Sequence, residues 1–283
     1  METLKTAFIL SALLACYSGA RRSKEVYKIS IDERGTRFNE TVVINDKEKH
    51  VVYTVPEHNG VVGSAILFDY KTGYFATRIP KLKECYIQRI SKGYSSPGLV
   101  RKNLERYRVF KESQSAVPVK TIKATVAKGQ KIDSREISFS LSTFCGDFAA
   151  YQAIQINHQE LFPMGGNVTN GKVWQKRYIK TYPIFVGREI SVQWNLWVKR
   201  DGKWVRLIGT MCKKYEDYIT DLEKDGCALN TKEWLLDCGA QSTSNCLYTI
   251  QCRRDTGIFR CKETHYTTDI LCCQVRCSKS GGR

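Results

Sequence analysis

The chain has 283 residues, of which 42% are hydrophobic, so it is long enough for one large domain or two small ones with a substantial core. Its longest apolar run, from about Ala7 to Tyr17, is shorter than the roughly 20 residues that a bilayer-spanning helix needs. The sequence therefore predicts no transmembrane segment. The formal net charge of +17 means that any partner bound through charge is acidic.

Residues 1–20 have the pattern of a cleaved signal peptide. Lys5 precedes the apolar run, and Ser18 and Ala20 have the spacing of small residues at a cleavage site. We expect a secreted, extracellular protein, with a signal anchor as the alternative. In that setting the basic charge favours sulfated glycans or other polyanions, anionic membranes or acidic proteins over nucleic acid; a solvated lysine-rich surface is the equal alternative.

The cysteine count also depends on this segment. Removing Cys16 with the signal reduces the 12 cysteines to 11, an odd number in a compartment where disulfides persist. The unpaired residue could be a free thiol, or it could link two chains as a homodimer. Two sequons, at Asn39 and Asn167, are predicted glycosylation sites.

The first strands are predicted to form a meander. Residues 21–63 contain alternating and β-branched runs that indicate an N-terminal β linker. Strands are then expected at Ala65–Tyr70 and Tyr74–Ile79, joined by a turn in which Gly73 adopts a positive φ angle. The run "ECYIQRI" predicts a third strand.

Two helices follow. From Ser96 the period changes, and an amphipathic helix is expected with one apolar face: Leu99, Val100, Leu104, Tyr107 and Phe110. Residues 115–134 have no clear period and predict a mobile loop. Asp133 or Ser134 is expected to cap a second, short helix that ends at Gly146, before a last strand from Ala149 to Ile156.

Two segments resemble the BRICHOS family. "SAILFDYKTGYFATRIPKLKECYIQRI", with Asp69 after an apolar strand and Cys85 before Tyr-Ile, is similar to the first half of a BRICHOS domain. "STFCGDFAAYQAI", which contains Cys145, is similar to its second half, and the preceding hairpins look like the linker of the gastrokine branch. The expected domain covers residues 64–158.

The resemblance implies an α+β fold: a central, mostly antiparallel sheet flanked by two helices, one on each face. Cys85 and Cys145 would be the disulfide of the domain, and Asp69 its characteristic acidic residue. The implied activity is that of a chaperone for an aggregation-prone β segment, usually one in the same proprotein.

Asp69 also has a simpler interpretation. It stands at the end of a strand, where a carboxylate can cap the Lys71-Thr72-Gly73 turn. If the carboxyl were buried, its pKa could rise and make assembly depend on pH. The sequence leaves both roles open.

Residues 159–218 supply a candidate client. Strands are predicted at Ile190–Val198 and Trp204–Gly209, around an Asp-Gly turn that is typical of hairpins. Such a segment is prone to edge pairing until its partner strands are made. We therefore expect the β-prone C-terminal region to be the client of the same chain.

Residues 219–283 are predicted to form a small, disulfide-rich β module after that hairpin. The expected odd thiol is Cys212 or one of the adjacent Cys272 and Cys273. Zinc is disfavoured because there is no paired C-x-x-C spacing, so neither a metal nor a cofactor is predicted. The cysteines of this region are Cys212, Cys227, Cys238, Cys246, Cys252, Cys261, Cys272, Cys273 and Cys277.

No catalytic motif is present, and the 4 histidines are scattered, so we predict that the protein is not an enzyme. Three functions remain open. The first is an intramolecular chaperone; the second is a precursor that releases a basic, cysteine-rich antimicrobial or signalling peptide. The third is an extracellular polyanion-binding protein in which the BRICHOS-like fold is only a scaffold.

Overall fold

The computed structural model describes residues 24–91, 95–113, 117–156, 162–163, 178–180, 184–186, 189–191, 196–200, 202–208, 212, 234–255 and 258–277. Expectations for the signal peptide (1–20), for Asn167 and for Cys227 fall outside these residues. Within the described part, no helix is both long and apolar enough to cross a bilayer.

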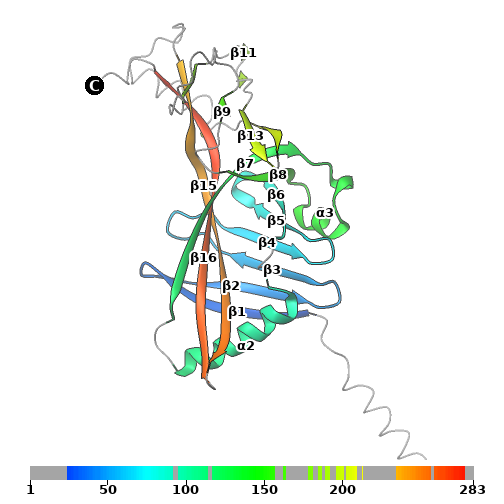
Figure 1. Cartoon of the computed structure of the whole chain (residues 1–283), viewed down its shortest axis with the longest axis vertical. Helices are drawn as coiled ribbons and strands as arrows, with labels where there is room; N and C mark the ends of the chain where they lie inside the picture. The colour runs from blue at the N-terminus through cyan, green and yellow to red at the C-terminus, as the bar shows by residue number, and fades with distance from the viewer. Residues whose placement is uncertain are drawn as a thin grey trace, which may run out of the picture.

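The fold is α+β and is built on an 11-stranded sheet that curls around its own core (Figure 1). Its strands follow the order β1-β2-β3-β4-β5-β6-β8-β7-β16-β15-β10. The pairs β6–β8 and β7–β16 are parallel, and the others are antiparallel. The first eight strands, which we call the N-terminal sheet, are β1 (Lys24–Glu33), β2 (Thr36–Asn45), β3 (His50–Val55), β4 (Ser64–Asp69), β5 (Tyr74–Ile79), β6 (Glu84–Arg89), β7 (Val119–Lys131) and β8 (Ala149–Ile156).

The predicted meander is present. Strands β1 to β6 pair antiparallel in chain order, and Gly73 has a φ angle of 75° in the β4–β5 turn. The short 3-10 helix η1 (Pro80–Leu82) connects β5 to β6. The expected N-terminal linker is therefore an integral part of the sheet, because β3 pairs with β4 along its whole length.

Helix α2 (Pro97–Ser113) has the predicted apolar face. Val100, Leu104, Tyr107 and Phe110 are buried, whereas Leu99 is 45% exposed and lies outside the core. Leu99 was placed on this face by the sequence pattern, but it directly precedes Val100 and is turned about 100° away around the helix axis.

Helix α3 (Phe139–Cys145) ends at Gly146, whose φ angle of 61° confirms the predicted glycine stop. Its cap differs from the prediction, because the Ser138 hydroxyl accepts the backbone N–H of Leu141. Asp133 instead caps the 3-10 helix η2 (Ser134–Glu136) that precedes α3. The break at residues 137–138 lets each short helix have its own cap.

The two helices pack on opposite faces of the sheet. Alternate residues of β4 point to opposite faces. Ile66 and Phe68 contribute to the cluster that contains the apolar face of α2, whereas Leu67 packs in the cluster that contains Leu141 of α3. Buried core residues therefore lie on both sides of β4.

The prediction of a loop over residues 115–134 is wrong. Most of this segment forms β7, which pairs with β8 on one side and with β16 on the other. Its polar and basic side chains masked a strand whose β-branched residues include Ile122 and Val126. The partner strand lies about 140 residues later in the chain, beyond the reach of local patterns.

The C-terminal residues do not form a separate module within the described part of the chain. Strands β15 (Trp234–Asp255) and β16 (Ile258–Cys277) form one long antiparallel hairpin that joins the N-terminal sheet. We call these two strands the C-terminal hairpin. It crosses the N-terminal sheet, and its closed end lies beside α2 (Figure 1).

The remaining strands are short. The predicted hairpin around Asp-Gly is present as β13 and β14, although its first strand begins later than Ile190. Gly202 has a φ angle of 78° in this turn. The elements are β9 (Phe162–Pro163), β10 (Tyr178–Lys180), β11 (Ile184–Val186), β12 (Glu189–Ser191), β13 (Leu196–Arg200) and β14 (Lys203–Leu207).

Candidate functional site

The C-terminal hairpin contacts the N-terminal sheet across a long sequence separation. Strand β16 pairs in parallel with β7, from Glu263 opposite Val119 to Ile270 opposite Val126. Pairing of β7 with β8 begins only at Thr125, so residues 119–124 of β7 have β16 as their strand partner. Without the hairpin this part of β7 would be an open sheet edge.

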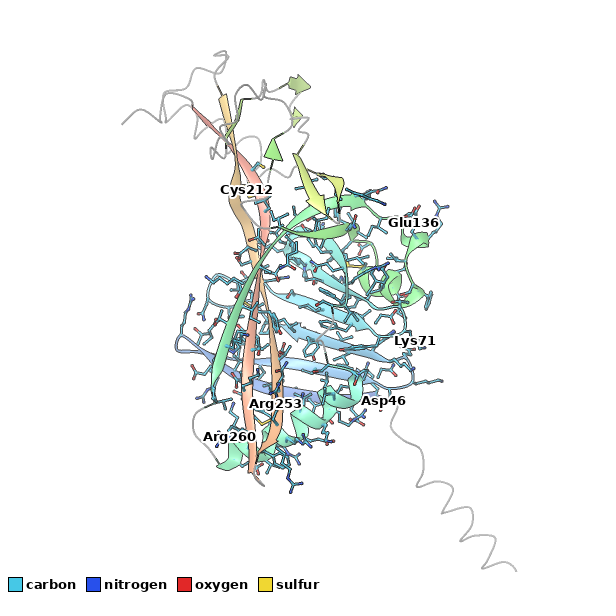
Figure 2. The ribbon with its side chains drawn as sticks, viewed as in Figure 1. Asp46, Lys71, Glu136, Cys212, Arg253 and Arg260 are labelled. Atoms are coloured by element: carbon cyan, nitrogen blue, oxygen red, sulfur yellow. A yellow bond between two sulfur atoms is a disulfide. The ribbon has the colours of Figure 1, made fainter. Side chains whose placement is uncertain are left out.

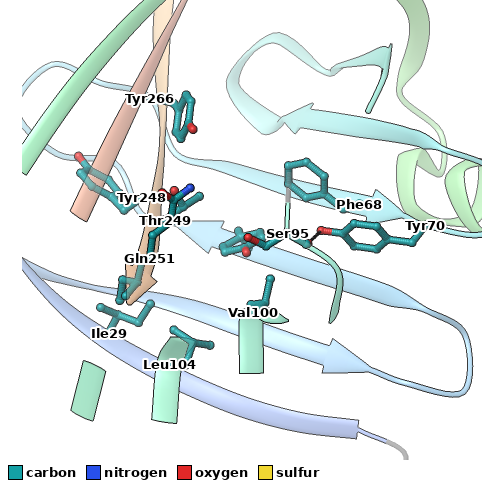
Figure 3. Close-up of a pocket in the computed structure, with 12 residues that line it drawn as sticks. Ile29, Phe68, Tyr70, Ser95, Val100, Leu104, Tyr248, Thr249, Gln251 and Tyr266 are labelled. Carbon is teal, nitrogen blue, oxygen red and sulfur yellow. Dashed lines mark hydrogen bonds between the residues drawn. The ribbon is translucent and has the colours of Figure 1, made fainter. Parts of the chain in front are cut away.

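Apolar side chains of the hairpin complete the core under α2. Leu247, Tyr248 and Ile250 of β15 are buried in the same cluster as Val100 and Leu104 of α2. Each fully buried side chain of this size contributes roughly 1.5–3 kcal/mol. Figure 3 shows residues of β15 and α2 on two sides of one small space.

That space is a cavity of about 30 Å³ between β1, β3, β4, α2 and the hairpin. Ile29, Phe68, Leu104 and Tyr248 are among its lining residues. It has room for a water molecule, whereas sites for small organic ligands have volumes of roughly 300–1,000 Å³. The apolar space between the N-terminal sheet and α2 is thus filled by the hairpin of the same chain.

Tyr248 is the centre of a buried polar contact. Its phenolic oxygen lies 2.8 Å from Nε2 of His58, and its hydroxyl donates to Glu33 over 3.2 Å. The His58 ring stacks on Phe38 at a centroid distance of 3.8 Å. Burial raises the pKa of Tyr248, assisted by the nearby Cys246 thiol and the Glu33 carboxylate. The hydroxyl therefore stays protonated as a donor.

Glu40 on β2 lies next to this contact and is fully buried, with 0% exposure. Its Oε1 accepts the backbone N–H of Tyr248 over 3.3 Å, while its Oε2 has no hydrogen-bond partner among the described residues. Burial raises the pKa of Glu40 well above its ordinary value. A neutral carboxyl is thus favoured at the place where β2 meets β15.

A second polar contact joins α2 to β16. The Tyr107 hydroxyl donates to Glu263, and Nε2 of His265 lies 3.3 Å from the same carboxylate. Burial alone would raise the pKa of Glu263, but the hydrogen bonds from His265 and Tyr107 outweigh it and lower the pKa. This carboxylate is charged and held by partners on two elements.

The closed end of the hairpin is fixed to α2. The backbone N–H of Cys252 donates to Oδ1 of Asn103 over 3.2 Å, and Cys252 forms a disulfide with Cys261 on the opposite strand. Asn103 is itself buried. A covalent link and a buried hydrogen bond therefore set the position of this end.

The predicted hairpin of β13 and β14 also contacts the N-terminal sheet. Leu207 is buried, and the backbone N–H of Ile208 donates to the carbonyl of Lys128 on β7 over 2.7 Å. A few residues later, Cys212 forms a disulfide with Cys272 of β16. Both parts of the expected client region thus meet β7 or its partner strand.

Cys85 and Cys145 form a disulfide, the pair that the family resemblance implies. It joins β6 to the end of α3, and both residues are buried. Closing a loop with a sequence separation of 60 residues stabilises a fold by about 4 kcal/mol in the chain-entropy treatment. This bond holds α3 against its face of the sheet.

Asp69 is 1% exposed and caps the turn that follows β4. Its Oδ1 accepts the backbone N–H groups of Lys71 and Thr72, and its Oδ2 accepts the Ser138 hydroxyl over 2.9 Å. Nε2 of His50 lies 3.5 Å from Oδ1. The capping role is therefore present, and the contact with Ser138 ties the turn to the start of α3.

The same contacts decide the protonation state of Asp69. Burial alone would raise the pKa of Asp69, but the hydrogen bonds from Ser138, Thr72 and Lys71 outweigh it and lower the pKa. The upward shift that burial alone would cause is not found at Asp69, because the site supplies several donors to the charged form.

The free thiol differs from the expected ones. Cys212 and Cys272 are bonded to each other, and Cys273 is also disulfide-bonded. Among the described cysteines, Cys246 is the free one, and it is 3% exposed in the core. Its burial disfavours a homodimer linked through this sulfur, because the core around β15 would have to open.

Three further predicted site residues lie on β2, β15 and β16. Asn39 is on an exposed position of β2, so its side chain is accessible. Cys238 and Cys277 lie within β15 and β16, whose side chains are not described at those positions. In the described ranges, no group of three or more His, Cys, Asp or Glu residues could hold a metal ion.

Residues 62–152 match the family model described as the BRICHOS domain. The chain contains a BRICHOS domain. It covers β4 to most of β8 together with α2 and α3, close to the expected boundaries of 64–158. The C-terminal hairpin lies outside the matched residues.

Two curated proteins are similar to part of the chain. Gastrokine-2 of Rattus norvegicus is 30% identical over 118 residues, which are 41% of this chain and 60% of that protein. Gastrokine-2 of Mus musculus is 25% identical over 115 residues, 40% of this chain and 60% of that protein. The chain thus spans about 60% of the length of these relatives. No solved structure matches it.

Sequence reasoning found the BRICHOS domain but missed the interface of the hairpin. Tyr248, Glu263 and Glu40 were not singled out, and the scattered histidines were assigned no role. His58 and His265 are instead buried partners of carboxylates. The sequence did contain one indication of this interface. Glu40 is two and four residues before Val42 and Ile44 on β2, and strand residues two apart share a face, so this pattern predicts a buried carboxyl.

Proposed function

We propose that this is a secreted protein whose BRICHOS domain acts as an intramolecular chaperone for the C-terminal hairpin of the same chain. The observation that carries the proposal is the parallel pairing of β16 with β7, over residues 263–270 and 119–126. The shared core with Tyr248 and the small size of the cavity support the same role.

The hairpin needs such a partner for physical reasons. A two-stranded hairpin is at best marginally stable by itself, and β15 and β16 are 22 and 20 residues long. Long β-branched and aromatic strands with unpaired edges promote association between chains. The BRICHOS domain precedes them in the chain, so its β7 edge is available before the hairpin is complete.

A peptide assay tests the proposal. The client is the paired segment from Thr243 to Ile270 with Cys246→Ser and the Cys252–Cys261 disulfide intact. Residues 24–156 are added at ratios below one to one, and fibril formation is followed by dye fluorescence. We expect a lag time that lengthens several-fold, and no such effect with the Cys85→Ser/Cys145→Ser variant.

An unchanged lag time with a folded domain, as judged by circular dichroism, would contradict the chaperone role. It would leave the interpretation in which the BRICHOS fold is a scaffold for polyanion binding. Slower fibril formation with both the native and the disulfide-free domain would instead indicate a generic effect of added protein.

Secretion is part of the proposal. It rests on the signal-peptide pattern of residues 1–20 and on the disulfides, which persist in oxidising compartments. Expression in cultured cells, followed by blotting of medium and lysate, tests it. Retention of the full chain in the lysate would contradict it.

Release of a cysteine-rich peptide is the second candidate, and the shared core argues against it. The dibasic pair Arg253-Arg254 lies in β15, next to a cysteine that is bonded across the hairpin. Removing the hairpin would expose the core face of α2 and the edge of β7. Mass spectrometry of the secreted species should show one intact chain.

A further inference from the structure

Basic side chains gather at the closed end of the C-terminal hairpin. We call Lys102 and Arg106 of α2, with Arg253, Arg254 and Arg260 of the hairpin, the hairpin-end cluster. The guanidinium of Arg106 lies 4.8 Å from the ring centroid of Phe259, and that of Arg254 lies 5.8 Å from it. Figure 2 shows Arg253 and Arg260 at this end, beside α2.

The side chains of the cluster are accessible to a ligand. Arg253, Arg254, Arg260 and Lys102 are exposed, and Arg106 is half-buried. In the part of the chain that the structure describes, no carboxylate forms an ion pair with Lys102, Arg106, Arg253 or Arg254. The ion pairs of α2 are instead made by Arg101, with Glu25 and Asp46.

The fold brings like charges together at this end of the hairpin. Arg253 stands directly opposite Arg260 in the strand register, and like charges in that position destabilise a sheet. Lys102 and Arg106 are four positions apart on α2, where like charges also repel. The disulfide between Cys252 and Cys261 holds the two arginine-bearing strands together next to the repelling pair.

We propose that the hairpin-end cluster binds the sulfate groups of a sulfated polysaccharide. Sulfate groups bound at Arg253 on one face of the hairpin, and at Arg254, Arg106 and Lys102 on the face that meets α2, would offset this repulsion. Each guanidinium group can donate two parallel hydrogen bonds to two oxygens of one sulfate. This role is independent of the chaperone activity, because it uses the outer end of the hairpin and not its core face.

The environment of Phe259 separates this ligand from other polyanions. Binding to single-stranded nucleic acid uses open aromatic faces on which bases stack, and docking on a membrane uses an exposed apolar anchor. The Phe259 ring is partly buried and has two guanidinium groups over it. The described surface of the cluster thus offers positive charge and guanidinium N–H donors, and it lacks an open aromatic face on which a base could stack.

Heparin binding by the full chain tests the proposal. Arg253→Gln/Arg254→Gln is compared with Lys47→Gln/Lys71→Gln, a control pair in the exposed β2–β3 and β4–β5 turns that removes the same charge. We expect the cluster variant to bind heparin roughly tenfold more weakly than the native chain. The slope of log affinity against log salt concentration should become smaller by about one for each arginine removed. The control should stay within about twofold.

Equal weakening in both variants would overturn the proposal, because it would show that net charge alone drives binding. The Arg253→Lys/Arg254→Lys variant keeps the charge and removes the forks. We expect this variant to bind heparin about threefold more weakly than the native chain, which is half of the tenfold effect on a logarithmic scale. Binding as tight as that of the native chain would overturn the role of the guanidinium groups.

Alternative probes identify the ligand class. Desulfated heparin, single-stranded DNA and vesicles of phosphatidylserine and phosphatidylcholine are titrated with the same variants. Loss of binding to desulfated heparin supports sulfate recognition. Tighter binding to DNA or to vesicles that depends on Arg253 and Arg254 would overturn the choice of a sulfated polysaccharide.

Discussion

Nε2 of His58 lies 2.8 Å from the phenolic oxygen of Tyr248, across a sequence separation of 190 residues. His58 precedes β4, and Tyr248 belongs to β15, so the contact joins the C-terminal hairpin to the segment just before the BRICHOS domain. Both side chains are buried, which makes the loss of either partner costly.

Removing the Tyr248 hydroxyl should weaken the whole fold. The Tyr248→Phe variant keeps the ring but leaves His58 and Glu33 without this partner. We expect the free energy of unfolding to fall by about 1–3 kcal/mol in urea denaturation. Tyr27→Phe is the control, because the Tyr27 hydroxyl bonds to Glu25 near the surface, and it should change stability by less than about 1 kcal/mol. Similar losses in both variants would contradict the role of the buried contact.

Glu40 should make the protein less stable as pH rises. Its pKa in the folded chain is raised above the ordinary 4.5, so its favourable contribution is complete below that pH and is lost as pH increases toward the folded value. The Glu40→Gln variant keeps an oxygen for the Tyr248 N–H and cannot ionise. We expect it to gain stability relative to the native chain between pH 5 and pH 8, as measured by thermal unfolding. A constant difference over that range would show that Glu40 does not titrate.

Asp69 should have the opposite dependence. Its pKa is lowered below the ordinary 3.8, so its contribution is present above that pH and is lost as pH falls through the folded value. Asp69→Asn should cost about 1–3 kcal/mol at pH 7, and the difference from the native chain should shrink below about pH 4. The exposed Asp32, which lies 3.6 Å from Arg37, provides a control in Asp32→Asn, with an expected effect of about 0–1 kcal/mol. A difference that grows on acidification would contradict the assignment.

Gly129 should not tolerate a side chain. A Cβ atom there would lie 2.6 Å from Cδ1 of Ile154 and 3.0 Å from the carbonyl oxygen of Gln152. We expect Gly129→Ala to cost about 1–3 kcal/mol through overpacking at the irregular part of the β7–β8 pairing. Gly98→Ala in α2 is the control, because no atom outside the neighbouring residues and the backbone of its own helix lies within 4 Å of the added Cβ, and it should be neutral or slightly stabilising. Chemical denaturation of the two variants distinguishes these outcomes.

Local patterns were sufficient for the meander and for α2. The turn at Gly73 and the spacing of Val100, Leu104, Tyr107 and Phe110 each depend on residues close together in sequence. The pairing of Cys85 with Cys145 was implied by the family resemblance. The structure shows what this disulfide does, because it joins β6 to the end of α3.

The position of the C-terminal hairpin could not be predicted in this way. The pairing of Val119 with Glu263 spans about 140 residues, and the β-prone pieces between the cysteines gave no indication of their partner. For the same reason the free thiol was sought at Cys212 or the adjacent pair. Cys246 is unpaired because it points into a core built by β15, which became visible only with the fold.

Hydrogen–deuterium exchange of the full chain tests most directly whether the hairpin and the BRICHOS domain are one cooperative unit. We expect the amides of residues 119–126 and 263–270 to be protected to a similar degree, and to lose protection together in Tyr248→Ala. Rapid exchange over residues 263–270 in the native chain, with residues 119–126 still protected, would contradict the proposed pairing.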